Sequence, residues 1–206
     1  MNRAAFRIDA DGWCGEARHL PSPNFDERPQ GVEPSLLVIH NISLPPGEFG
    51  GSWIAGLFTN ALDFAAHPAF EQLRGLRVSA HFLIRRDGEL MQFVSCNGRA
   101  WHAGISSFAG KERCNDFSIG VEMEGSDLEP FADVQYETLT ALTRGLGFRY
   151  RLTDVAGHEH IAPGRKTDPG PFFDWQKFRG ALLDDGMQPS ANRPDQIASL
   201  RFPFLA

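Results

Sequence analysis

The chain has 206 residues, a formal net charge of −6 and 42% hydrophobic residues. This length and apolar fraction fit one domain with a core large enough to fold without disulfides. The acidic balance disfavours a nucleic-acid partner, because phosphate binding needs a concentrated basic face and the basic residues here are scattered.

The first third of the chain combines an arm, a strand, a helix and loops. Residues 1–34 are rich in Pro, Asp, Arg and Gly, which predicts an irregular N-terminal arm. The Val- and Ile-rich run 35–43 predicts a buried strand whose end delivers His40 and Asn41. Pro and Gly predict a loop after it. Apolar residues at helical spacing predict a helix over 53–64, and a second loop follows.

The clearest local pattern is a β-hairpin over 78–94. Two β-rich runs flank the Asp-Gly pair at 87–88, and Asp-Gly is typical of a tight hairpin turn. A further strand is predicted over 116–125. In it, Glu122 and Glu124 alternate with apolar residues, so both carboxylates share one face.

Two helices complete the pattern. Asp133 is the predicted N-cap of a helix over 133–150, and Asp174 opens a last helix over 175–185. The Pro-rich tail from Gly186 is predicted to be irregular. Alternating strands and helices predict an α/β (α+β) domain with a central mixed β-sheet flanked by helices.

The chain therefore divides into an arm (1–34), one functional domain (35–186) and a C-terminal extension (187–206) whose role the sequence does not indicate. It contains no internal repeat. The long loops after His40 and His158 are where a functional site is expected.

The compartment is inferred from the cysteines and from the lack of long apolar runs. Three cysteines, an odd number without a C-x-x-C pair, favour a reducing compartment. The first 20 residues contain no apolar run of signal-peptide length, and no window approaches the ~20 apolar residues of a membrane span. We therefore expect a cytoplasmic protein without a membrane segment.

Residues 157–170 read GHEHIAPGRKTDPG and concentrate polar groups in a Gly- and Pro-rich segment. His158 and Asp168 are of the types that a catalytic zinc ion prefers; such an ion takes three N or O ligands and keeps a fourth position for water. His40, at the end of the buried strand, is our choice for the third ligand. Because the three residues come from distant parts of the chain, their spacing is weak evidence for a metal site. The two histidines could instead be ordinary hydrogen-bonded residues.

Other polar residues have two interpretations each. His160 would point the same way as His158 on an extended segment, but we favour a surface or supporting position because residues 161–163 turn the chain away. Lys166 would lie on the same side as Asp168 and could stabilise an oxyanion, or it could be a solvated surface lysine. Either Glu122 or Glu124 could act as a general base, and the residue types do not rank them.

The remaining candidates for chemistry are two histidines and two cysteines. His81 is interpreted as structural and His102 as a residue that could line a pocket. Cys96 and Cys114 are poor candidates for nucleophiles, because no partner histidine is indicated.

Several motifs together resemble a known family over residues 12–178. They are SLLVIHNISLPPGEFGG, SAHFLIRRDGEL, RAWHAG, RCNDFSIGVEMEG and GHEHIAPGRKTDPGPFFDW. These stretches resemble the amidase-2 family of zinc N-acetylmuramoyl-L-alanine amidases, most closely its cytoplasmic members that act on 1,6-anhydro-N-acetylmuramoyl-L-alanine. The resemblance implies the fold shared with peptidoglycan-recognition proteins.

The resemblance also implies roles for individual residues. One Zn²⁺ per chain would be held by His40, His158 and Asp168, and Glu122 and Lys166 would be the catalytic groups. This ranks Glu122 above Glu124 by analogy alone.

The implied substrate is a muropeptide, cleaved between (1,6-anhydro)-N-acetylmuramic acid and L-alanine in cell-wall recycling. Asn41 would contact the sugar or the amide, and Arg77 and Arg113 would pair with carboxylates of the stem peptide. For each arginine, a surface salt bridge is the alternative. We expect a monomer with no nucleic-acid or membrane partner. The alternative functions are an inactive muropeptide-binding protein on the same fold, or an amidase of intact cell wall.

Overall fold

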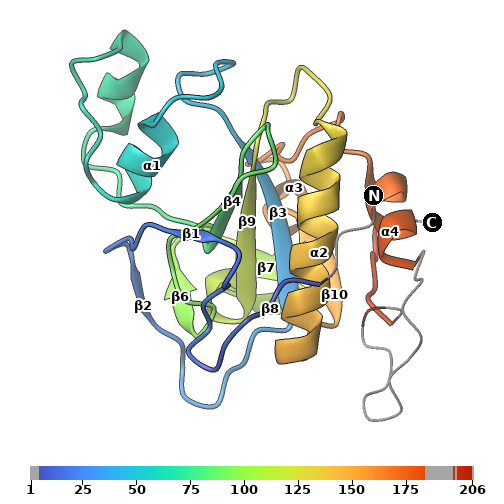
Figure 1. The fold of residues 1–206 in the computed structure, drawn as a ribbon. Helices are drawn as coiled ribbons and strands as arrows, with labels where there is room; N and C mark the ends of the chain where they lie inside the picture. The colour runs from blue at the N-terminus through green and yellow to red at the C-terminus, as the bar shows by residue number, and fades with distance from the viewer. Residues whose placement is uncertain (1–4, 184–196, 198, 206) are drawn as a thin grey trace.

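A six-stranded mixed sheet forms the centre of the protein (Figure 1). The computed structural model describes residues 5–183, 197 and 199–205. The strand order is β1-β5-β4-β9-β3-β10, and only the β4–β5 pair is antiparallel. The bounds are β1 Arg18–His19, β3 Leu36–Ile42, β4 Phe82–Ile84, β5 Leu90–Gln92, β9 Ser118–Glu124 and β10 Asp154–Gly157. The predicted mixed sheet is confirmed.

Strands β3 and β9 pair in parallel inside the sheet and are buried over nearly their whole length, which agrees with the apolar run of β3. Their odd-numbered residues, such as Leu37 and Val121, pack into the main core. Their even-numbered residues point to the opposite face. In the register of the pair, His40 lies opposite Glu122, so both side chains leave the sheet on the same side.

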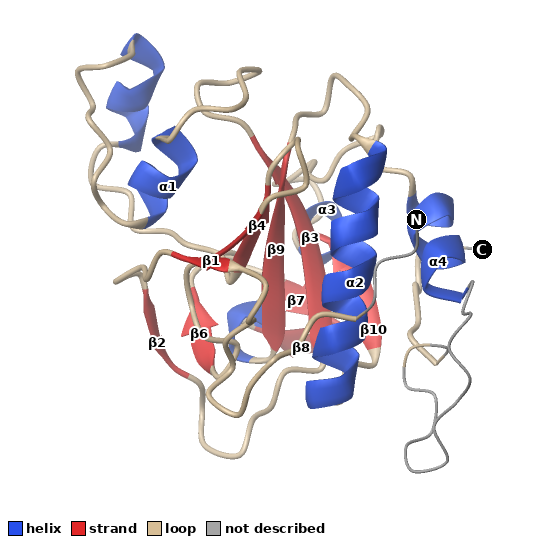
Figure 2. Ribbon diagram, in the orientation of Figure 1, coloured by secondary structure: helices blue, strands red, loops and turns tan. Residues whose placement is uncertain are grey.

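The helices lie on different parts of the sheet (Figure 2). Helices α2 (Asp133–Arg149) and α4 (Trp175–Leu183) cover the odd-numbered face through residues such as Leu139 and Phe178. Helix α1 (Trp53–Phe58) and the 3-10 helix η1 (Pro68–Leu73) belong to a second apolar cluster, which reaches the sheet at β4 and β5. No helix of the described ranges is both long and apolar enough to span a bilayer.

The remaining elements are short. Strand β2 (Phe25–Glu27) pairs with β6 (Gly98–Ala100), and β7 (Ser107–Phe108) pairs with β8 (Lys111–Glu112). The 3-10 helix η2 spans Cys114–Asp116, and helix α3 spans His158–Ile161.

Most predicted elements are present, but their ends differ. The hairpin is confirmed with strands of three residues, and Gly88 takes the left-handed conformation (φ 83°) that its turn requires. The helix predicted over 53–64 ends at Phe58, because Asn60 is also left-handed (φ 60°). The loop predicted after it contains η1, which the His67 ring caps by accepting the Ala69 N–H.

The two predicted helix caps have different outcomes. The prediction that Asp174 opens the last helix is confirmed, since its Oδ1 accepts the Lys177 N–H at 2.8 Å. Asp133 is wrong as an N-cap, because the helix begins at Asp133 itself and Ala132 occupies the cap position. Ala132 donates its N–H to Gln135 Oε1 at 3.0 Å. The cap is therefore formed by a side chain three residues into the helix, which the sequence pattern did not indicate.

Both ends of the chain add backbone to the sheet. The arm predicted to be irregular contains β1 and β2, and β1 extends one edge. At the other edge, Arg201 donates its N–H to Thr153 O and accepts the Val155 N–H on its own carbonyl, at 3.0 and 2.9 Å. The last two residues of the predicted helix 175–185, and most of the extension, lie outside the described residues.

Candidate metal centre and catalytic site

Parallel pairing of β3 with β10 brings two histidines together. Ile39 is the register partner of Gly157, so the next residues, His40 and His158, leave the sheet at the same edge. His158 is the first residue of α3. The loop after α3 returns Asp168 to this point, where its carbonyl accepts the Glu159 N–H at 2.8 Å.

The three predicted ligands point at one another with atoms that can hold a cation. His40 Nδ1 lies 3.0 Å from His158 Nδ1 and 3.0 Å from Asp168 Oδ2. The His158 Nδ1 to Asp168 Oδ2 distance is 3.1 Å. A tetrahedral zinc ion with ligands at ~2.0–2.1 Å would hold them about 3.3 Å apart. The donor types and spacing therefore fit a zinc ion with small adjustments, and among the described residues these three form the one such group.

The far nitrogens of both imidazoles are hydrogen-bonded. His158 Nε2 lies 3.0 Å from the carbonyl oxygen of Ala103, which can only accept, so this nitrogen carries the proton. His40 Nε2 lies 2.9 Å from His102 Nδ1. Such contacts fix the ring orientation and leave Nδ1 available to a metal.

The charge states at neutral pH also suit a cation. Burial lowers the pKa of His40 to about 4, which the neighbouring Asp168 carboxylate only partly offsets. Burial by itself would raise the pKa of Asp168, but the close contacts of its carboxylate with the His158 and His40 rings hold this pKa below its usual range. The site thus presents a neutral His40 imidazole and an ionised Asp168 carboxylate, the forms that bind metals.

The two carboxylates of β9 have different surroundings. Glu124 is fully engaged: its oxygens accept from Gly50 N (2.8 Å), Arg86 N (3.0 Å) and Arg85 Nε (3.2 Å). Glu122, across from His40, is buried, and its Oε2 has no hydrogen-bond partner among the described residues. Burial, with the nearby Asp168 charge, raises the pKa of Glu122 well above its usual value. The unpartnered oxygen beside the donor group favours Glu122 over Glu124 as the reactive carboxylate.

Lys166 and Asn41 line an open cavity of about 430 Å³ that also contains Asp168. The Lys166 side chain is exposed. Asn41 Nδ2 donates to Asp127 Oδ1 (2.6 Å) and to the Pro169 carbonyl (3.0 Å), so its amide group also holds the wall of the cavity together.

Asp127 is a residue of this cavity that the sequence did not single out. The sequence offered only the glycine at position 170 as a signal, and the structure gives its meaning: Gly170 is left-handed (φ 82°), and a Cβ atom there would clash with the Asp127 side chain. The glycine of the K-T-D-P-G stretch therefore makes room for Asp127.

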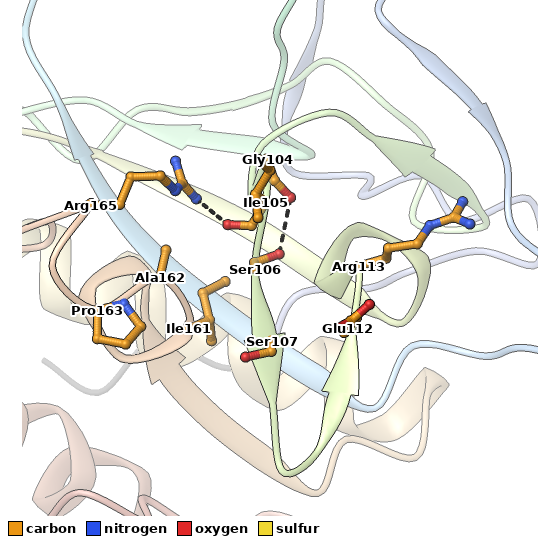
Figure 3. A pocket seen from close by; sticks show the side chains of 10 residues that line it. All are labelled: Gly104, Ile105, Ser106, Ser107, Glu112, Arg113, Ile161, Ala162, Pro163 and Arg165. Carbon is orange, nitrogen blue, oxygen red and sulfur yellow. Dashed lines mark hydrogen bonds between the residues drawn. The ribbon is translucent and has the colours of Figure 1, made fainter.

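Arg113 lines a second cavity, of about 530 Å³, opposite Arg165 (Figure 3). Its Nε pairs with Asp116 Oδ2 at 3.4 Å, and its side chain is 70% exposed. Arg165 lines both cavities, so the two open onto the same loop. Arg77 is exposed and lines neither of these two cavities. The substrate roles of Arg77 and Arg113 stay predictions.

The other histidines are placed as follows. His160 lies outside the metal-binding group. Residues 158–161 are helical, which removes the alternative in which His158 and His160 point the same way on an extended segment. His160 Nδ1 accepts the Gly157 N–H at 2.8 Å, a supporting position. His81 is structural, as interpreted, since its Nδ1 accepts the Gly120 N–H at 3.0 Å. His102, which the sequence suggested could line a pocket, is buried and lies against His40.

Comparisons with known proteins agree with this geometry. Residues 30–171 match the Amidase_2 family, described as N-acetylmuramoyl-L-alanine amidase. The 1,6-anhydro-N-acetylmuramyl-L-alanine amidase AmpD of Citrobacter freundii is 59% identical over 174 residues, which cover 84% of this chain and 93% of that protein. The crystal structure of a selenomethionine derivative of AmpD superposes with a TM-score of 0.82 at 58% identity, covering 84% of this chain and 98% of the other.

A more distant structure contains a substrate. It is a complex of the Escherichia coli amidase AmiD with anhydro-N-acetylmuramic acid-L-Ala-D-γ-Glu-L-Lys. It superposes with a TM-score of 0.54 at 28% identity and covers 77% of this chain and 65% of the other.

Proposed function

This chain belongs to the N-acetylmuramoyl-L-alanine amidase family, and we propose that it works with one zinc ion held by His40, His158 and Asp168. It hydrolyses the amide bond between 1,6-anhydro-N-acetylmuramic acid and the L-alanine of the stem peptide, in muropeptide recycling. The observation that supports the zinc proposal is the convergence of three ligand atoms beside the unpartnered oxygen of Glu122.

The reaction needs an activated water, a stabilised oxyanion and a protonated leaving group. Zinc, when bound, polarises the substrate carbonyl and lowers the pKa of water towards ~7. Glu122 accepts the proton of the attacking water and later delivers it to the L-alanine nitrogen, so that the amide C–N bond breaks and a free amine leaves. The raised pKa makes the ionised Glu122 carboxylate a stronger base than an exposed glutamate, which favours its acceptance of a proton from water.

We propose that Lys166 stabilises the negative charge that develops on the carbonyl oxygen. It lines the same cavity as Asp168, and its charge acts on Glu122, whose pKa it lowers in opposition to burial and Asp168. A cation at this position contributes most in the transition state, when the oxygen carries a full charge.

Substrate recognition is assigned to polar groups around the cavity. We place the sugar or the scissile amide near Asn41, and the carboxylates of the stem peptide near Arg77 and Arg113. Arg113 is exposed on an open cavity, where an exposed guanidinium can exchange its Asp116 partner for a carboxylate of the ligand.

The alternative of an inactive binding protein is disfavoured. A protein that only bound muropeptides would have no need for a buried carboxylate oxygen without a hydrogen-bond partner, which costs free energy. The general-base role that we propose for Glu122 gives this oxygen a function.

The deciding experiment compares wild type with Glu122→Gln on 1,6-anhydro-muropeptide and on intact cell wall, with products identified by mass spectrometry and zinc content measured in both proteins. We expect wild type to release a free L-Ala-peptide from the small substrate and the variant to keep its zinc but lose turnover. Equal turnover in the two proteins would remove Glu122 from the mechanism. Preference for the intact polymer would reassign the substrate.

Location, assembly and domain limits complete the proposal. We propose a cytoplasmic monomer whose catalytic domain is residues 35–186. All three cysteines are free and buried, which fits a reducing compartment. Light scattering of the purified protein tests the monomer.

A further inference from the structure

His102 lies directly behind the metal-binding face of His40. The His40 Nε2 to His102 Nδ1 distance is 2.9 Å, and His102 Nε2 lies 3.1 Å from Ser118 Oγ. The two rings meet edge to face, with centroids 5.0 Å apart and planes at 87°. Both are buried, so each ring nitrogen must find its partner inside the protein.

One arrangement of protons satisfies this row of groups and leaves the metal site free. If His40 presents the lone pair of Nδ1 to a cation, its proton is on Nε2 and needs an acceptor. His102 Nδ1 accepts it only when the His102 proton is on Nε2, from which it is donated to Ser118 Oγ. The opposite arrangement, with the protons on Nδ1 of both rings, would place a proton on His40 Nδ1 and block the metal site.

Strand β9 provides the space for this row. A Cβ atom at Gly120 would lie 2.5 Å from Cγ of His102 and 2.6 Å from its Nδ1. A residue with a side chain at this position would therefore push the His102 ring away from His40. Ser118 and Gly120 are two residues apart on the same face of β9, so one strand both supports the ring and accepts its hydrogen bond.

Asn115 fixes the backbone on which His102 stands. Its Oδ1 accepts the N–H groups of His102 (3.2 Å) and Ala103 (2.8 Å). The carbonyl of Ala103 in turn accepts from His158 Nε2 (3.0 Å) and from Arg165 Nη2 (2.8 Å). Two consecutive residues thus hold both metal-binding imidazoles, one through a side chain and the other through a carbonyl.

We propose that His102 is a positioning residue of the metal centre, anchored by Asn115, which keeps His40 in the tautomer that binds the cation through Nδ1. This inference rests on the proposed zinc site. It predicts that zinc affinity depends on a hydrogen-bond acceptor at the Nδ1 position of residue 102, as expected for a group that orients a ligand.

The test uses two polar variants that differ in where the acceptor lies. In His102→Asn, the side-chain oxygen takes the place of Nδ1 and still accepts from His40. In His102→Gln, the amide group reaches the place of Nε2 and leaves the Nδ1 position without an acceptor. The zinc dissociation constant is measured by competition with a chromogenic chelator, and the stability of the zinc-free proteins by urea denaturation.

We expect His102→Gln to weaken zinc binding about 10- to 100-fold and His102→Asn to stay within a few-fold of wild type. Equal zinc affinity in wild type and the Gln variant, or an equal loss in both variants, would overturn the proposal. If the Gln variant does not fold, Ser118→Ala is the test. This substitution removes the acceptor of the His102 Nε2 proton, so we expect zinc binding to weaken several-fold. An unchanged zinc affinity would overturn the proposal. If wild type itself does not bind zinc, the proposed cofactor is wrong, which is a separate outcome.

Discussion

The aromatic ring of Phe204 lies flat against the imidazole of His160, with centroids 3.7 Å apart and planes inclined by 11°. Trp175 meets the edge of Phe204 at a centroid distance of 4.6 Å. Because His160 Nδ1 accepts the Gly157 N–H, this stack supports the residue immediately before His158. The described part of the C-terminal extension, for which the sequence indicated no role, therefore contributes to the support of the candidate metal centre.

We predict that Phe204→Ala lowers the free energy of unfolding by about 1–2 kcal/mol, less than a fully buried phenylalanine would cost because this ring is half-buried. Urea denaturation measures the change. Phe172→Ala, at a phenylalanine that is 44% exposed, is the control and should change stability by less than about 0.5 kcal/mol. Similar losses in the two variants would show that the stack on His160 contributes nothing specific.

Zinc should stabilise the folded protein through Asp168. Because a metal that binds only the native state adds RT ln(1 + [L]/Kd), a hundredfold excess over Kd adds about 2.7 kcal/mol. Asp168→Ala removes one of three ligands, so we expect zinc to raise the melting temperature of wild type and to leave that of the variant nearly unchanged. A chelator should reverse the wild-type shift. An equal zinc-dependent rise in both proteins would exclude Asp168 as a ligand.

The two glutamates of β9 should separate catalysis from stability. Glu122→Gln should lower kcat by about 10²- to 10⁴-fold, the usual contribution of a general base, with its zinc content unchanged. Glu124→Gln should instead cost about 3 kcal/mol or more of stability, because it leaves the Arg85 guanidinium beside a neutral group. Activity per folded molecule, measured together with urea denaturation, checks both. A catalytic loss in Glu124→Gln without a loss of stability would reverse the assignment.

Stability should fall on acidification below about pH 6.5. Burial, together with the Arg28 charge, lowers the pKa of His81 well below 6.5. In the window below 6.5 the unfolded chain therefore binds a proton that the folded protein does not, so the free energy of unfolding decreases as the pH falls. His81→Asn should reduce this slope by up to about 1.4 kcal/mol per pH unit. Urea denaturation at pH 7.5, 6.5 and 5.5 measures the slope, and an unchanged slope would contradict the prediction.

The sequence predicted the parts of the fold that depend on local patterns. The apolar run of β3, the Asp-Gly turn and the Asp174 cap all follow from residue types close together in the chain. The metal-binding group was proposed because residue types and the end of a predicted strand coincided.

What the sequence did not indicate depends on tertiary contacts. The residue types alone did not rank Glu122 above Glu124, which only the family resemblance did; in the structure, the difference follows from partners of Glu124 as far away as Gly50, 74 residues along the chain. His102 could not be placed behind His40, because 62 residues separate them and no spacing rule relates a loop to a strand. For His160 the local backbone decided between the alternatives: the four residues after β10 form a helical turn instead of an extended chain, and His160 takes the supporting position that the sequence analysis favoured.

His40 and Asp168 are 128 residues apart in the chain, and the fold brings them to within 3.0 Å. At roughly 5–20 residues per second, a ribosome needs about 6–26 seconds to pass from one to the other. During that interval the nascent polypeptide has the first ligand but not the last, and an isolated imidazole holds a metal only weakly. The zinc ion that we propose would therefore be held by all three ligands only after translation has passed Asp168, and we expect cells short of zinc to accumulate a complete but unloaded protein.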